Sequence, residues 1–185
     1  LYRLILGLLS REFTPGETVL LKPTNAANNL LEDAQAMGSP AALMYAHLED
    51  FLVSVLKKGE ACRSFIRTQY NIFTLDPCAL AGFDPRQAMT FTDLQVATLV
   101  WRYQLELFHK CRNGKITLRD GDFLSGKSLA LTEMVSGLGL KHTQNDIVDI
   151  VNGPVFTRNV KFETQSQSLD ARDAEAQTVR ERYNE

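Results

Sequence analysis

The chain has 185 residues, of which 44% are hydrophobic and 23% are charged, and its formal net charge is −2. This length and balance are typical of one globular domain with enough apolar residues to form a core. A net charge so close to zero excludes a protein that binds nucleic acid or membranes through its overall charge. Any basic binding surface must therefore be local.

The first 23 residues predict an N-terminal arm or a truncated element that lies outside the core. Leu1–Leu9 is apolar, but it is too short for a membrane span, which needs about 20 residues. We expect a buried helix or strand there, with the apolar region of a signal peptide as the alternative. A turn at Thr14–Glu17 leads into the run Thr18–Pro23, which we expect to be extended and to end at its proline.

Residues 24–153 are predicted to form a helical core domain. Helices are expected from Asn25 to about Met37, from Pro40 to Lys57 and from about Glu60 to Tyr70. The second of these begins with a serine N-cap followed by a proline at the first helical position, which is a typical helix start. Its apolar stripe recurs at helical spacing and consists of Met44, Leu48, Phe51, Leu52, Val55 and Leu56. The side chains expected to point inward from the third helix are Phe65, Ile66 and Tyr70.

The strongest predicted element is a helix from Thr92 to about Arg112. Thr92 and Gln95 form the capping box that begins such a helix. Apolar residues cover most of its circumference, and a helix of this kind normally lies at the centre of a core. They are Leu94, Ala97, Trp101, Leu105 and Phe108 on one face and Val96, Val100, Tyr103, Leu107 and Cys111 on another.

The remaining chain is predicted to contain a short edge strand, two helices and a C-terminal arm. The strand is expected at Lys115–Arg119, and the helices at 127–138 and from Thr143 to about Val151. The arm comprises residues 154–185 and includes a charged helix at 169–183 with a thin apolar stripe. Such a helix is marginal by itself in water, so we expect it to dock on another surface. The predicted fold is mainly α: a multi-helix globular core with extended N- and C-terminal arms.

Residues 121–128 read Gly-Asp-Phe-Leu-Ser-Gly-Lys-Ser and match the GxxxxGKS pattern of phosphate-binding P-loops. In a P-loop, backbone N–H groups cradle phosphates, the lysine reaches the β- and γ-phosphates, and the hydroxyl binds Mg²⁺. The predicted order of strand, loop and helix around the motif supports this interpretation.

Three features oppose the P-loop interpretation. The strand before a P-loop is normally buried and apolar, whereas Lys115–Asp120 alternates and carries three charges. No convincing strand with a metal-binding aspartate follows, and Asp120 and Asp122 would repel phosphates. We therefore predict an ordinary loop in which Ser125 caps the next helix. Nucleotide binding is the alternative, and its candidate residues are Gly126, Lys127 and Ser128.

Two segments carry a local excess of positive charge. Residues 57–67 contain four cations and one carboxylate, and residues 102–127 contain six cations and three carboxylates. Each segment adjoins an end of a core helix, so we predict that the two line one groove for a nucleic-acid backbone. The candidate residues are Lys57, Arg63, Arg67, Arg102, Arg112, Lys115 and Arg119. The alternative is a set of solvated helix ends whose cations complement the helix dipoles.

Catalytic and metal-binding signals are absent from the sequence. It has no GxSxG or HExxH motif and no evident Cys/His/Asp set, and its three cysteines and three histidines are scattered. We therefore predict a non-enzymatic protein with no catalytic residues, no metal site and no cofactor. A sparse, odd number of cysteines is typical of a reducing compartment such as the cytoplasm.

The layout of a helical core, two arms and a basic groove resembles that of filament-forming viral nucleoproteins and coat proteins. The run Leu99–Leu105 (LVWRYQL) is similar to the central helix of flexuous plant-virus coat proteins. The resemblance implies a self-assembling structural protein that binds single-stranded RNA in a nucleocapsid or virion, contacts other copies through its arms and does not enter membranes. The alternatives are a P-loop nucleotide-binding protein and a helical protein–protein adaptor domain.

Overall fold

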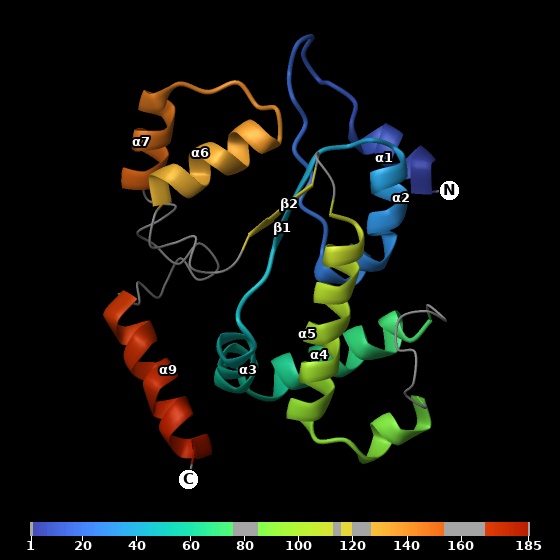
Figure 1. Ribbon diagram of the computed structural model, residues 1–185, viewed down its shortest axis with the longest axis vertical. Coiled ribbons are helices and arrows are strands. Elements are labelled where there is room, and N and C mark those ends of the chain that lie inside the picture. Colours follow the sequence, from blue (N-terminus) through green and yellow to red (C-terminus); the bar gives the residue numbers. More distant parts are fainter. Residues whose placement is uncertain (1, 76–84, 113–115, 120–126, 154–168, 185) are drawn as a thin grey trace.

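The computed structural model describes residues 2–75, 85–112, 116–119, 127–153 and 169–184 (Figure 1). Helices account for most of these residues, so the predicted mainly α fold is confirmed. No helix among the described residues combines the length and apolar character that crossing a bilayer requires.

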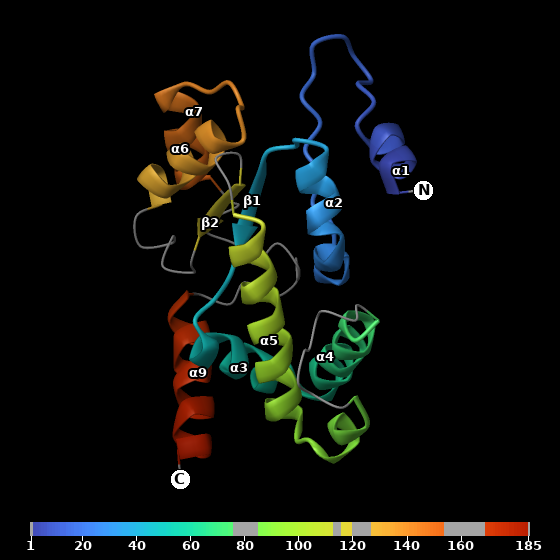
Figure 2. The same ribbon diagram turned by 45° about the vertical axis from the view of Figure 1, so that its right-hand side comes forward.

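The N-terminal arm is helical but is not buried against the core. Helix α1 (Tyr2–Leu9) leaves the side chains of Leu4 and Leu8 63% and 52% exposed. Figure 2 shows α1 apart from the helices that surround α5, beyond a loop formed by residues 10–24. The expectation of a buried element at residues 1–9 is therefore wrong, because no described segment packs extensively against the apolar face of α1.

The first core helices begin where the sequence predicts. Asn25–Leu30 forms a 3-10 turn, η1, which continues into α2 (Leu31–Ala36). Gly38 follows with a φ of 70°, a conformation that glycine adopts without steric cost and that ends this helix.

The next segment corrects the prediction of a helix beginning at Pro40. Residues Ala41–Met44 form strand β1, which pairs in parallel with β2 (Ile116–Arg119). The register places Ala41 opposite Ile116 and Met44 opposite Arg119. Alanine, leucine and methionine favour helices locally, but pairing with a distant strand and burial of Leu43 override that preference.

Helix α5 (Asp93–Lys110) forms the centre of the core, as its all-round apolar pattern predicts. The capping box predicted at Thr92 and Gln95 is present. Helices α3 (Leu48–Lys57) and α4 (Gly59–Phe73) pack against α5, and η2 (Pro85–Thr90) precedes it (Figures 1 and 2). The buried side chains of the central cluster include Val55, Ile66, Tyr70, Phe73, Val96, Val100, Tyr103 and Phe108.

Two features of α4 qualify the sequence prediction. Ile66 and Tyr70 are buried as expected, but Phe65 is 48% exposed. Residues 65 and 66 lie about 100° apart around a helix, so a face that buries residues 66 and 70 turns residue 65 toward solvent.

Helices α6 (Lys127–Gly137) and α7 (Gln144–Asn152) form a pair beside the sheet. Helix α6 contacts both strands as well as α7. Helix α7 begins where the sequence predicts, and Thr143 forms its N-cap. Helix α9 (Leu169–Asn184) matches the predicted C-terminal helix and packs against α3 of the same chain (Figure 1).

Candidate functional site

Because β1 and β2 pair in parallel, the carboxyl ends of both strands lie at the same end of the sheet. Met44 and Arg119 are register partners at this end. The chain enters α3 at Leu48 shortly after β1, and the next described element after β2 is α6, which starts at Lys127. In parallel α/β sheets, ligands bind at the carboxyl ends of the strands because the following loops and helix N-termini meet there. The carboxyl end of the β1–β2 sheet is therefore the candidate functional site.

The loop after β1 is held in place by the central helix. Trp101 donates a hydrogen bond from Nε1 to the carbonyl oxygen of Ala46, at 2.7 Å. On either side of Ala46, the rings of Tyr45 and His47 meet edge to face with their centroids 6.3 Å apart. The core thus fixes the position of three consecutive residues at the carboxyl end of β1.

The first turn of α6 carries the two described residues of the GxxxxGKS motif. Lys127 is half-buried and Ser128 is exposed, while residues 120–126, including Gly126 and the predicted cap Ser125, lie outside the described residues. The first backbone N–H groups of a helix have no intrahelical acceptor, and the helix dipole favours an anion near them. Lys127 adds a cationic side chain to the same turn.

The first turn of α3 carries two carboxylates that bind a distant arginine. Arg180 of α9 donates to Glu49 from Nε at 2.7 Å and to Asp50 from Nη2 at 2.6 Å. The hydrogen bond to Glu49 is the main reason why the pKa of Arg180 is raised. The guanidinium offsets negative charge close to the carboxyl end of β1. No sequence signal links Arg180 to Glu49 and Asp50, because Arg180 is far from both along the chain and the contact depends on helix packing.

Two of the predicted RNA-binding arginines instead connect core helices. Arg63 and Arg67 of α4 both reach Asp93 at the start of α5, with Nε–Oδ distances of 3.2 and 2.7 Å. Arg67 also donates from Nη2 to the carbonyl oxygen of Phe91 at 2.8 Å. These contacts fix the N-terminal end of α5 against α4, which is a structural role that charge counting does not reveal.

Other predicted RNA-binding residues also pair within the chain. Lys57 forms an ion pair with Glu175, with an Nζ–Oε2 distance of 2.8 Å. Arg102 forms one with Glu106, with an Nε–Oε1 distance of 2.6 Å. Arg112 is exposed just beyond the end of α5. Arg119 ends β2, and Lys115 lies outside the described residues.

The structure separates Arg63 and Arg67 of the first basic segment from Arg112 of the second. Helix α5 has 18 residues and spans about 27 Å at 1.5 Å per residue. Arg63 and Arg67 lie at its beginning, and Arg112 follows its end. Arg63 and Arg67 therefore lie at the opposite end of α5 from Arg112, and Arg102 lies within the helix between them.

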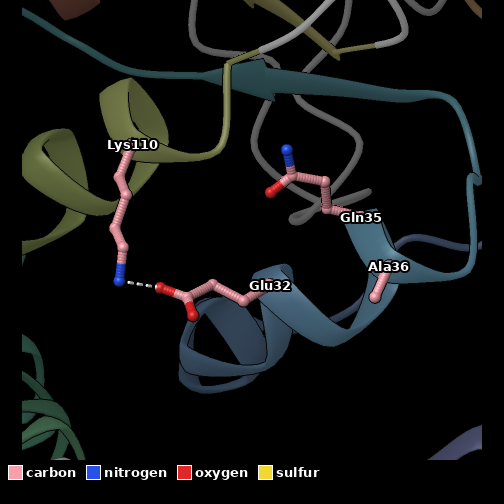
Figure 3. Close-up of a pocket in the computed structure, with 4 residues that line it drawn as sticks. All are labelled: Glu32, Gln35, Ala36 and Lys110. Carbon is pink, nitrogen blue, oxygen red and sulfur yellow. Dashed lines mark ion pairs between the residues drawn. The ribbon is translucent and has the colours of Figure 1, made fainter.

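A solvent-open hollow lies between α2 and the end of α5 (Figure 3). It is lined by Glu32, Gln35, Ala36 and Lys110, and Glu32 forms an ion pair with Lys110 across it. The neighbouring thiol of Cys111 is buried, and this burial together with the charge of Glu32 raises its pKa. A thiol in this state stays protonated at neutral pH, so Cys111 is suited to packing and poorly suited to nucleophilic chemistry.

Among the described residues, no group of three or more histidine, cysteine, aspartate or glutamate side chains is arranged to hold a metal ion. No protein-family model, curated protein or solved structure matches this chain. Its function is therefore inferred from the geometry of the strand ends and the helices that follow them.

Proposed function

We propose that this chain binds a nucleotide or a similar phosphorylated ligand at the carboxyl ends of strands β1 and β2. The observation that carries the proposal is the parallel pairing of β2 with β1, followed along the chain by α6. A P-loop requires a strand of a parallel sheet that leads into a helix N-terminus. The sequence alone lacked a partner for β2, because the segment that pairs with it resembles a helix.

Each group near the carboxyl ends of the two strands has a specific role in the proposal. The N–H groups in the first turn of α6 bind phosphate oxygens, as helix N-termini commonly do. Lys127 compensates the phosphate charge, and Ser128 contributes a hydroxyl ligand for the accompanying Mg²⁺. The loop 45–47, fixed by Trp101, forms the neighbouring wall at the end of β1.

The proposal is tested by calorimetric titration with ATP in the presence and absence of Mg²⁺. We expect saturable, Mg²⁺-dependent binding that Lys127→Ala weakens at least about tenfold, since a hydrogen bond to a charged group contributes about 1.5–3 kcal/mol. Lys141→Ala is the matched control, because Lys141 is an exposed lysine close in sequence but outside α6.

The control variant should bind ATP as the unmodified protein does. Pyrophosphate should compete with ATP if the phosphates are the recognised groups. Absence of binding, or equal binding by the Lys127→Ala variant, would contradict the proposal. Circular dichroism of each variant establishes that α6 and the core remain folded.

The exposed arm favours a second candidate, a non-enzymatic protein that self-assembles and packages single-stranded RNA. Apolar side chains that stay in water commonly mark interaction sites. They occur along the whole arm, at Leu4, Ile5, Leu8, Leu9, Phe13, Leu20 and Leu21. Arg112 supplies an exposed cation at the end of α5 for a phosphate contact.

Light scattering and the 260/280 nm absorbance ratio of protein purified without nuclease test this candidate. Large particles with a nucleic-acid-like ratio that dissociate in high salt are the expected result. Leu8→Glu should reduce assembly by placing a charge on the apolar face of α1, whereas Ser10→Glu, at an exposed position just past α1, should not. A monomer free of nucleic acid would exclude packaging.

A further inference from the structure

Strand β1 has a free edge, which no other strand among the described residues covers. One side of β1 pairs with β2, and among the described residues no strand pairs with the other side. Parallel strands rarely stand as an isolated pair, because their stability depends on neighbouring strands and on cover over both faces. The backbone groups along this edge are therefore available to a further strand.

The segment Thr18–Leu21 begins with strand-favouring residues but pairs with no strand in the part of the chain that the structure describes. It reads Thr-Val-Leu-Leu, and the β-branched residues Thr18 and Val19 favour strands. Leu20 and Leu21 are 63% and 41% exposed, and the described residues contain no ladder besides that of β1 and β2. Pro23 follows and ends the run, as proline does at strand ends.

The connection between this segment and β1 fits a parallel pair. Residues 22–40 contain η1 and α2, and a crossover of a dozen or more residues, usually helical, is what parallel neighbours require. Figures 1 and 2 show the limb of the blue loop that leads into α2 running in the same general direction as β1. The segment therefore needs to move sideways but does not need to reverse its direction.

We propose that Thr18–Leu21 closes onto the free edge of β1 as a third parallel strand of the same chain. Closure pairs the backbone groups of both segments. Successive side chains in a strand point to opposite faces of the sheet, so closure places Leu20 on one face and Leu21 on the other. Both leucines then lose contact with water. The same-chain edge is favoured over that of a second copy, since the tether through η1 and α2 keeps the segment at high effective concentration.

Amide hydrogen exchange of the full chain tests the closure, followed by mass spectrometry or NMR. We expect the amides of residues 18–21 that point toward β1, and the amides of β1 that point away from β2, to exchange at least about tenfold more slowly than in an unstructured chain, at a rate independent of protein concentration. Val19→Pro and Leu20→Pro are compared, because consecutive amides point to opposite sides of a strand and one of the two must lie in the new ladder.

At least one proline variant should lose the protection of residues 18–21 together with that of the β1 amides that point away from β2, while the amides of β1 that face β2 keep theirs. Phe13→Pro is the control, since Phe13 is exposed in the same arm but outside the strand-like run. The proposal is overturned if residues 18–21 exchange like unstructured chain, or if both proline variants keep the protection. It is also overturned if protection appears only in a dimer, which would assign the edge to a second copy.

Discussion

At the scale of single residues, the clearest structural signals are the two capping boxes. In the second, Thr143 Oγ1 accepts a hydrogen bond from the backbone N–H of Asp146 at 3.2 Å. Asp146 Oδ2 in turn accepts one from the backbone N–H of Thr143 at 2.7 Å. Two N–H groups that the helix leaves unpaired are thereby satisfied by residues three positions apart. Sequence alone identifies such caps because every participating group is local.

The cap of α7 predicts a measurable pKa shift. The backbone N–H of Thr143, followed by its hydroxyl, lowers the pKa of Asp146 from the ordinary 3.8 by favouring the ionised carboxylate. A depressed pKa means that this stabilisation is complete above the unfolded-state pKa and is lost as pH falls through the folded-state pKa. NMR titration of the Asp146 carboxyl should show the lowered pKa in the unmodified protein.

Thr143→Ala should raise the pKa of Asp146 toward 3.8, because it removes the hydroxyl that holds the carboxylate in place. Thr178→Ala is the control, since Thr178 lies in α9 and its hydroxyl bonds only to its own helix. An Asp146 pKa that is already ordinary in the unmodified protein would show that this cap does not form in solution.

At the scale of elements, charged side chains position several helices relative to one another. Arg63 and Arg67 join α4 to Asp93 at the start of α5. Helix α9 is held on α3 by two sets of ion pairs. Arg180 of α9 pairs with Glu49 and Asp50 of α3, and Glu175 of α9 pairs with Lys57 of α3. These contacts lie near the surface, so salt screens them more than it screens the buried core. We therefore expect the docking of α9 to be the most salt-sensitive packing among the described helices.

Arg180→Ala should release α9 from α3. We expect faster cleavage of α9 at Glu175 and Glu181 by a protease that cuts after glutamate, because a released helix of this length unfolds readily in water. Rising salt should produce the same acceleration in the unmodified protein. Arg182→Ala is the matched control, since Arg182 is an exposed arginine two residues further along α9. Equal cleavage rates for both variants at low salt would mean that Arg180 does not hold α9.

At the scale of the whole molecule, α5 organises the fold. It packs against α3, α4 and η1, and its Trp101 anchors the loop after β1. Strands β1 and β2 flank the α3–α5 region in sequence, so packing of these helices brings the two strands together with their carboxyl ends side by side. The candidate ligand site is thus a consequence of the helical core, although none of its charged groups belongs to α5.

The predictable part of the site was the motif, and the unpredictable part was its setting. Residue spacing alone named Lys127 and Ser128 as candidates, although the surrounding sequence favoured an ordinary loop and left nucleotide binding as the alternative. The partner of β2 was not, because Ala41–Met44 has helical propensity and its pairing involves residues far along the chain. The ion pairs of Arg63, Arg67 and Arg102 were missed for a related reason: a charge count records where cations occur but not which carboxylates they meet.

The sequence by itself determined the features that depend on neighbouring residues. These include the capping box at Thr92, the start of α7 at Thr143 and the all-round apolar helix α5. Their physical causes act within one or two helical turns. Only the tertiary structure decided that residues 41–44 form a strand, that Arg180 binds the first turn of α3, and that the apolar face of α1 remains in water. Each of these depends on which distant surface is available, and local pattern carries no information about that.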